Sequence, residues 1–282
     1  MKILRKLYLA GQTIVIRETP SRKIEKGKKR APKKNLTSEE VWKNNLKNAI
    51  FNLTLILNHN FMPGDHHLQL TYEFEPTLEQ GKKDRQAFTR KLTAECRKLG
   101  IDFKWVAVTE YKGKRIHHHI ICTGVPMDII KKCWTHGIVF HNPLWDNPNY
   151  KDLANYLLKE ASKLYQSEGK IFKRRYNTSR NIVIPEEHPE ELSRIDLEAE
   201  PKPLKDYYID GEVERYEHAI TRLTCREYVL VPLTEEPRIK NWKKCNTTPE
   251  ERINYSKLLR NAYHEHQMGL DVFCDWQNQE GI

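Results

Sequence analysis

The sequence predicts an α+β fold in which an antiparallel central sheet is flanked by helices. Between residues 67 and 165, the patterns follow the order strand, helix, strand, strand, helix, strand, helix. A short turn containing glycine, Lys112-Gly113-Lys114, joins the two middle strands, which is typical of a β-hairpin. Helices interspersed with a hairpin favour an α+β sandwich.

The N-terminal segment carries the whole excess of positive charge. Residues 1–35 hold twelve Lys and Arg and two acidic residues, and the net charge of the 282-residue chain is +10. Such a basic arm attracts nucleic acid by displacing the counterions of phosphate groups, although a solubilising tail has the same composition. Within the arm, residues 7–16 are apolar but are interrupted by Gly11, Gln12 and Thr13. This stretch is interpreted as a short hairpin rather than a signal peptide.

The first helix and first strand of the central region have clear boundaries. Thr37 and Glu40 have the spacing of a capping box, which predicts a helix over residues 36–61 that ends at Pro63-Gly64-Asp65. Residues 67–74 then alternate as a strand. Its apolar face is expected to hold Leu68, Leu70, Tyr72 and Phe74.

The remaining elements follow from periodicity and from the positions of proline and glycine. Expected are a helix over 77–99, strands over 103–110 and 115–123, a short helix from Pro126, a strand after Gly137, a helix over 152–165 and a last helix from Thr248. No apolar run approaches the length of about 20 residues that a membrane span needs. Six cysteines without a CxxC pair are typical of a reducing cytoplasm. The sequence lacks a GxxxxGK[ST] stretch, so no nucleotide-hydrolysing motor is expected.

Three consecutive histidines lie in the strand over 115–123. Because alternate residues of a strand share a face, His117 and His119 point to one side and His118 to the other. Glu110 ends the partner strand of the hairpin and can complete a set of two histidines and one carboxylate, which suits Mn²⁺, Mg²⁺, Zn²⁺ or Fe²⁺. Histidines on a polar sheet face would give the same pattern.

The helix over 152–165 adds a candidate nucleophile. Leu153, Leu157 and Leu164 form its expected buried stripe, and Tyr156 and Lys159 lie along one flank. A tyrosine at such a boundary is often a core residue with a solvated hydroxyl. A lysine one turn later also suits a phenolic nucleophile whose target phosphate is held by cations.

Taken together, these motifs resemble the HUH endonucleases, and specifically the rolling-circle replication initiators of phages and plasmids. That family has a hydrophobic-Thr-hydrophobic strand, a His-hydrophobic-His strand and a helix with Tyr-x-x-Lys. The chain has, in the same order, "LTY" at 70–72, His117-x-His119 and Tyr156-x-x-Lys159. The resemblance covers about 50–185. It departs from the family at His118, where a bulky apolar residue is usual, and at Tyr150, because some members use two tyrosines.

The resemblance implies an HUH fold with a ferredoxin-like or RRM-like core, and a specific reaction. Glu110, His117 and His119 would hold a divalent ion, Mg²⁺ or Mn²⁺, while Tyr156 attacks a phosphodiester and Lys159 orients it. The DNA strand would end in a 5′-phosphotyrosine linkage and a free 3′-hydroxyl. Basic residues after the catalytic helix are expected to contact DNA phosphates, with an exposed basic face as the alternative: Lys173, Arg174, Arg175 and Arg180.

The implied organisation is a basic N-terminal arm over 1–35, a nicking domain over 36–185, and an extension over 186–282 that is a candidate for origin recognition or dimerisation. The implied partners are single-stranded DNA at an origin, a host helicase and a host polymerase, in the cytoplasm of a bacterial host and without a membrane. Three alternatives stay open: a relaxase or transposase of the same superfamily, a non-haem iron enzyme with the same ligand set, and a non-catalytic DNA-binding protein.

Overall fold

The computed structural model describes residues 2–20, 37–111, 115–163, 174–193, 196–218 and 223–233. These residues form an α+β fold with two five-stranded antiparallel sheets, as the sequence predicts for its central region. The turn at 112–114, the centre of the basic arm and the helix expected from Thr248 lie outside the described residues.

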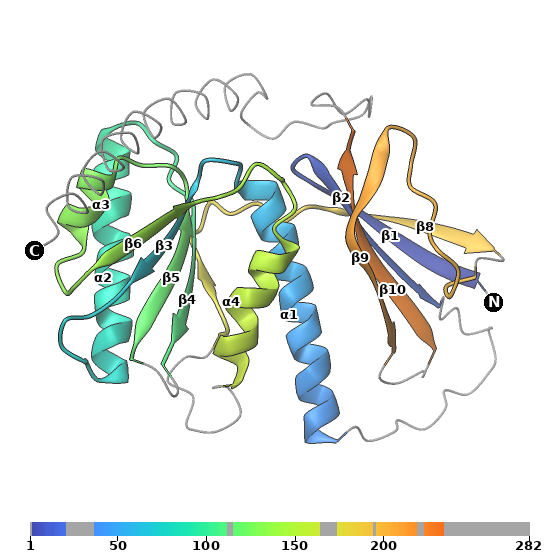
Figure 1. Ribbon diagram of the computed structural model, residues 1–282, viewed down its shortest axis with the longest axis horizontal. Helices are drawn as coiled ribbons and strands as arrows, with labels where there is room; N and C mark the ends of the chain where they lie inside the picture. The colour runs from blue at the N-terminus through green and yellow to red at the C-terminus, as the bar shows by residue number, and fades with distance from the viewer. Residues whose placement is uncertain are drawn as a thin grey trace, which may run out of the picture.

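The first sheet is the centre of a three-layer sandwich (Figure 1). Its strands, in spatial order, are β6 (Val139–Pro143), β3 (His66–Leu70), β5 (His117–Cys122), β4 (Trp105–Glu110) and β7 (Asn177–Thr178). Helices α2 (Leu78–Lys98) and α3 (Met127–Cys133) cover one face, and α1 (Ser38–Asn60) and α4 (Lys151–Lys163) cover the other.

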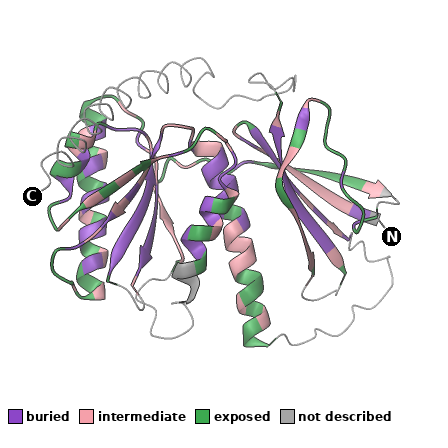
Figure 2. Ribbon diagram, viewed as in Figure 1, coloured by how far each residue is buried: buried purple, intermediate pink, exposed green. Residues whose placement is uncertain are grey.

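Burial follows the alternation that the sequence shows. Leu68, Ala107 and Ile120 pack with α2 and α3, whereas Val106 and Ile121 pack with α1 and α4. Every residue of β5 is buried, so this strand lies at the centre of the sandwich (Figure 2). A buried central strand positions its polar side chains between two packed layers.

The expected strand over 67–74 is longer than the structure shows. β3 ends at Leu70, and the side chain of Phe74 is 81% exposed instead of lying on the buried face. The side chain of Arg115 donates hydrogen bonds to the carbonyl oxygens of Tyr72 and Glu73. Because these side-chain bonds take up carbonyl groups that a ladder would use, the chain bends after residue 72.

The capping box at the start of α1 is confirmed. The side chain of Thr37 accepts a hydrogen bond from the backbone of Glu40, and the Glu40 carboxylate accepts one from the backbone of Thr37. In α4, Leu153 and Leu157 are buried as expected, and Leu164 lies outside the described residues. The buried leucines hold α4 against α1 and the sheet.

The second sheet joins the two ends of the chain. Its order is β8 (Glu187–Ser193), β1 (Lys2–Ala10), β2 (Thr13–Pro20), β10 (Thr224–Pro232) and β9 (Tyr207–Glu217). The hairpin expected over 7–16 is therefore confirmed as the turn of β1 and β2. It pairs with residues beyond 186, although the sequence assigns the two stretches to separate segments. α1 lies between the two sheets, and its Phe51 and Leu55 pack against the second one (Figure 1).

Asn58 connects the second sheet to the start of α4. Its amide donates to the hydroxyl of Thr13 at 2.9 Å and accepts from the backbone N–H of Tyr150 at 2.8 Å. Gly11, with φ +64°, lies so close that a Cβ atom there would be 2.0 Å from the Asn58 carbonyl oxygen. The hairpin turn is thus fastened to the helix pair that carries the candidate nucleophile.

Candidate metal centre

The register of the β4–β5 hairpin brings Glu110, His117 and His119 to one face of the sheet. Glu110 pairs with His117, and Val108 pairs with His119. Residues that oppose each other in an antiparallel pair point to the same side, so these side chains all face α1 and α4. The expectation that only 117 and 119 share the face with the carboxylate is consistent with this geometry.

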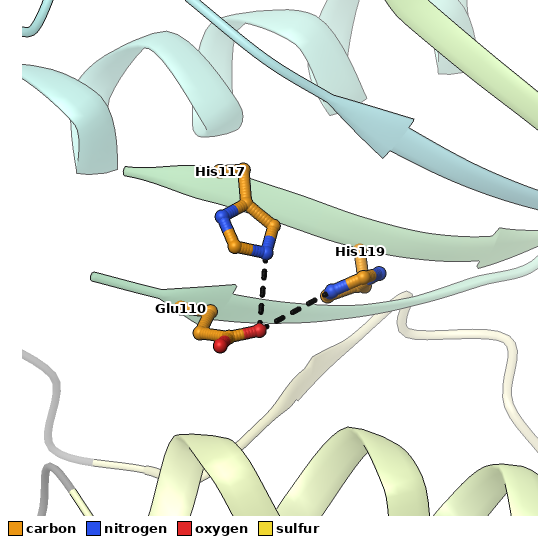
Figure 3. Close-up of side chains that lie close together, drawn as sticks. All are labelled: Glu110, His117 and His119. Carbon is orange, nitrogen blue, oxygen red and sulfur yellow. Dashed lines mark hydrogen bonds and ion pairs between the residues drawn. The ribbon is translucent and has the colours of Figure 1, made fainter. Parts of the chain in front are cut away.

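The three side chains converge on one point (Figure 3). Nε2 of His117 lies 3.0 Å from Oε2 of Glu110, and Nε2 of His119 lies 3.6 Å from the same oxygen. One ligand atom from each residue lies within 4.8 Å of the others, and all three residues are buried. Adjacent ligands bound at about 2.1 Å to an octahedral ion are about 3 Å apart, so this set can hold a metal ion with little rearrangement.

Neighbouring groups orient both imidazoles. Nδ1 of His117 lies 2.9 Å from the carbonyl oxygen of Arg115, which can accept its N–H and leave Nε2 as the ligand atom. Nδ1 of His119 lies 3.0 Å from Nε2 of His67 on β3. Burial lowers the pKa of His67 to about 4, so His67 is neutral at pH 7 and can accept the N–H of His119.

Sequence reasoning did not identify His67 as part of this site. A signal exists in its strand: Leu68 and Leu70 face α2 and α3, so His67 must face the metal cluster. What the strand pattern does not contain is the pairing of β3 with β5, which brings His67 beside His119. The contact therefore depends on sheet order.

His118 belongs to the opposite face and is a core residue. Its side chain is fully buried, with Nε2 2.9 Å from the hydroxyl of Tyr72 and Nδ1 2.9 Å from the hydroxyl of Thr109. Burial holds the pKa of His118 well below its usual value, so the ring is neutral. Of the three consecutive histidines, the middle one is thus a hydrogen-bonded part of the core.

Tyr156 lies next to this cluster. Its ring centroid is 5.6 Å from that of His119 and 6.5 Å from that of His67, and 52% of its surface is exposed. Lys159, one turn further along α4, is also exposed. The helix therefore presents a solvent-accessible phenol beside the candidate metal ligands.

Tyr150 differs from Tyr156 in every relevant respect. Its side chain is fully buried among the residues that α1 and α4 share with the sheet. Burial raises the pKa of its hydroxyl, and within the described residues that hydroxyl has no hydrogen-bond partner. A phenol in this position is a packing residue and cannot reach a DNA phosphate without unfolding of the core.

The structure separates the basic residues that the sequence groups together. Arg174 and Arg175 line a pocket against α1, whereas Arg180 lines a different hollow beside the C-terminal end of α2. Lys173 lies outside the described residues. Any contact of these side chains with DNA would therefore involve at least two separate surfaces.

Comparison with known proteins adds one finding to this geometry. Residues 65–165 match the model of a family of replication-associated proteins, the ORF2 family. No curated protein and no solved structure matches the chain.

The segment that matches the replication-associated family contains the whole candidate site. It begins at the residue before β3 and runs past the end of α4, so it includes Glu110, His117, His119 and Tyr156. The match supports a role in replication initiation, and the buried cluster supports the binding of a metal ion. The second sheet lies outside the matched segment. Among the helices that the structure describes, none has the length and hydrophobicity needed to span a membrane.

Proposed function

We propose that this protein is a rolling-circle replication initiator that nicks and rejoins single-stranded DNA at an origin. The observation that carries the proposal is the position of Tyr156, whose ring lies 5.6 Å from that of His119 in a buried Glu-His-His cluster. The match of residues 65–165 to a replication-associated family supports the same assignment.

The proposed roles follow from the chemistry of phosphoryl transfer. A bound Mg²⁺ or Mn²⁺ would polarise the scissile phosphate and offset charge on its oxygens. Glu110, His117 and His119 hold that ion, and His67 keeps the His119 ring in the orientation that binding requires. The Tyr156 oxygen attacks the phosphorus, the bond to the 3′-oxygen breaks, and the products are a 5′-phosphotyrosine linkage and a free 3′-hydroxyl. Lys159 orients the phosphate.

The covalent linkage conserves the energy of the phosphodiester, so a later 3′-hydroxyl can reverse the step and rejoin the strand. The free 3′ end would prime a host polymerase, and a host helicase would unwind the duplex in the cytoplasm of a bacterial cell. Tyr156 is the single nucleophile in this proposal, because Tyr150 is enclosed in the core.

The test is the formation of a covalent adduct. Labelled single-stranded fragments of the protein's own replicon are mixed with the protein, with and without Mn²⁺, and adducts are detected on a denaturing gel. We expect a metal-dependent adduct that Tyr156→Phe abolishes and the matched variant Tyr150→Phe retains. Loss of the adduct only in Tyr150→Phe would reassign the nucleophile. Absence of any adduct across origin-containing fragments would contradict nicking and leave the DNA-binding and iron-enzyme alternatives.

A further inference from the structure

A second polar pocket lies between α1 and the segment around β7. Its volume is about 350 Å³. One wall is the side of α1 that carries Asn45, Asn48 and Asn52, and the other wall includes Arg174 and Arg175. Among the described residues that line the pocket, none is acidic. The pocket therefore combines positive charge with several amide groups.

The three asparagines form a row on one face of α1. Their spacing of three and four residues brings them onto neighbouring turns of the same side. Asn48 accepts a hydrogen bond from Nη1 of Arg17 at 3.3 Å, whereas the exposed amides of Asn45 and Asn52 have no partner among the described residues. Asparagine is a poor helix former, so helix stability does not explain this row.

The arginine wall lies toward the candidate metal centre. β7 pairs antiparallel with β4, with Thr178 opposite Val106 and Asn177 opposite Ala107. Residues that precede Asn177 therefore lie toward the C-terminal end of β4, where Glu110 is located. Arg174 is three residues before Asn177, so a strand leaving the candidate metal centre needs only a short path to this pocket.

We infer that this pocket binds nucleotides of the DNA strand that flank the nick, and that Asn45 and Asn52 read their bases. This inference rests on the proposed function, because it supplies the substrate strand. A carboxamide has one acceptor and two donors, which match N6 and N7 of adenine in a bidentate pair. Arg174 and Arg175 contact the phosphates, which contribute affinity without sequence preference. The pocket thus prefers adenine in the flanking strand.

The test measures binding without catalysis. Fluorescence anisotropy is recorded for labelled oligo(dA) and oligo(dT) of equal length, in EDTA and over a range of salt concentrations. We expect the wild-type protein to bind oligo(dA) at least about fivefold more tightly, since one bidentate pair contributes about 1–3 kcal/mol of discrimination. The double variant N45A/N52A is expected to lose this preference with an unchanged salt slope. The matched control is Asn44→Ala, which changes an exposed asparagine outside the pocket lining.

The arginine wall has a different expected signature. The double variant R174A/R175A should weaken binding of both oligonucleotides and should reduce the salt slope by about 0.7 for each lost phosphate contact. A wild-type protein without adenine preference, or a preference that N45A/N52A retains, would overturn the inference.

Failure of the inference and failure of nicking are distinguishable. An adduct that forms without an asparagine-dependent preference overturns base reading alone. An asparagine-dependent preference in a protein that forms no adduct supports base reading and contradicts nicking. Both asparagines are exposed and alanine favours helix, so loss of folding is not expected to interfere, and thermal unfolding of each variant checks this.

Discussion

Replacing His118 by leucine separates the role of the middle histidine from those of its neighbours. The volume of the side chain is nearly kept, but the hydroxyls of Tyr72 and Thr109 lose the ring nitrogens that lie 2.9 Å away. A buried polar group left unsatisfied costs about 1–3 kcal/mol. Tyr72 retains the carbonyl oxygen of Gly81 at 3.4 Å, so its loss is partial. We expect a decrease of about 2–4 kcal/mol in the free energy of unfolding.

The assay is urea unfolding in EDTA, in parallel with Mn²⁺ binding followed by electron paramagnetic resonance. With a urea dependence of about 2 kcal/mol per molar, the unfolding midpoint of His118→Leu should fall by about 1–2 M. Its Mn²⁺ affinity should be unchanged, because the ring faces away from Glu110.

The matched variant His119→Leu should show the reverse behaviour. It removes a candidate ligand, and since partners of ligands alone contribute about 10–100-fold in affinity, Mn²⁺ binding should weaken by more than about 100-fold. Its stability should change less than that of His118→Leu, because the partner His67 is only half-buried and can bond water instead. If His118→Leu lost Mn²⁺ binding at full stability, the assignment of the two faces would be refuted.

Three further predictions concern the surrounding core. Tyr150→Phe should keep or raise stability by up to about 1 kcal/mol in urea unfolding, because it removes a buried hydroxyl without a partner among the described residues; a large loss would show an undetected bond. Asn58→Ala should cost about 2–3 kcal/mol by the same method, since it removes the bonds to Thr13 and to the Tyr150 backbone; a neutral result would contradict the fastening of α4. Burial lowers the pKa of His66, so the unfolded chain binds the proton more readily and stability should fall below about pH 6.5 by up to about 1.4 kcal/mol per pH unit. Comparing unfolding at several pH values with that of His66→Gln, which should reduce this slope, tests the assignment.

The sequence alone determined the features that depend on local periodicity and spacing. The capping box of Thr37 and Glu40 and the alternation of β5 each involve residues within a few positions of one another. For that reason the separation of His118 from the other two histidines, and the position of Glu110 opposite His117, follow from strand alternation and a short hairpin. The end of β3 did not, because side-chain bonds from the distant Arg115 decide it.

Only the tertiary structure decided which distant segments meet. The pairing of residues 2–20 with residues 187–232 has no local signal, since any amphipathic strand can add to either edge of a sheet. The contact of His67 with His119 requires the order of β3 and β5, and the burial of Tyr150 requires α4 to pack on α1. Both tyrosines have helical neighbours in the sequence, but packing leaves 52% of Tyr156 exposed and encloses Tyr150. The physical reason is that burial depends on the surfaces that surround a side chain, and those surfaces come from elements far away along the chain.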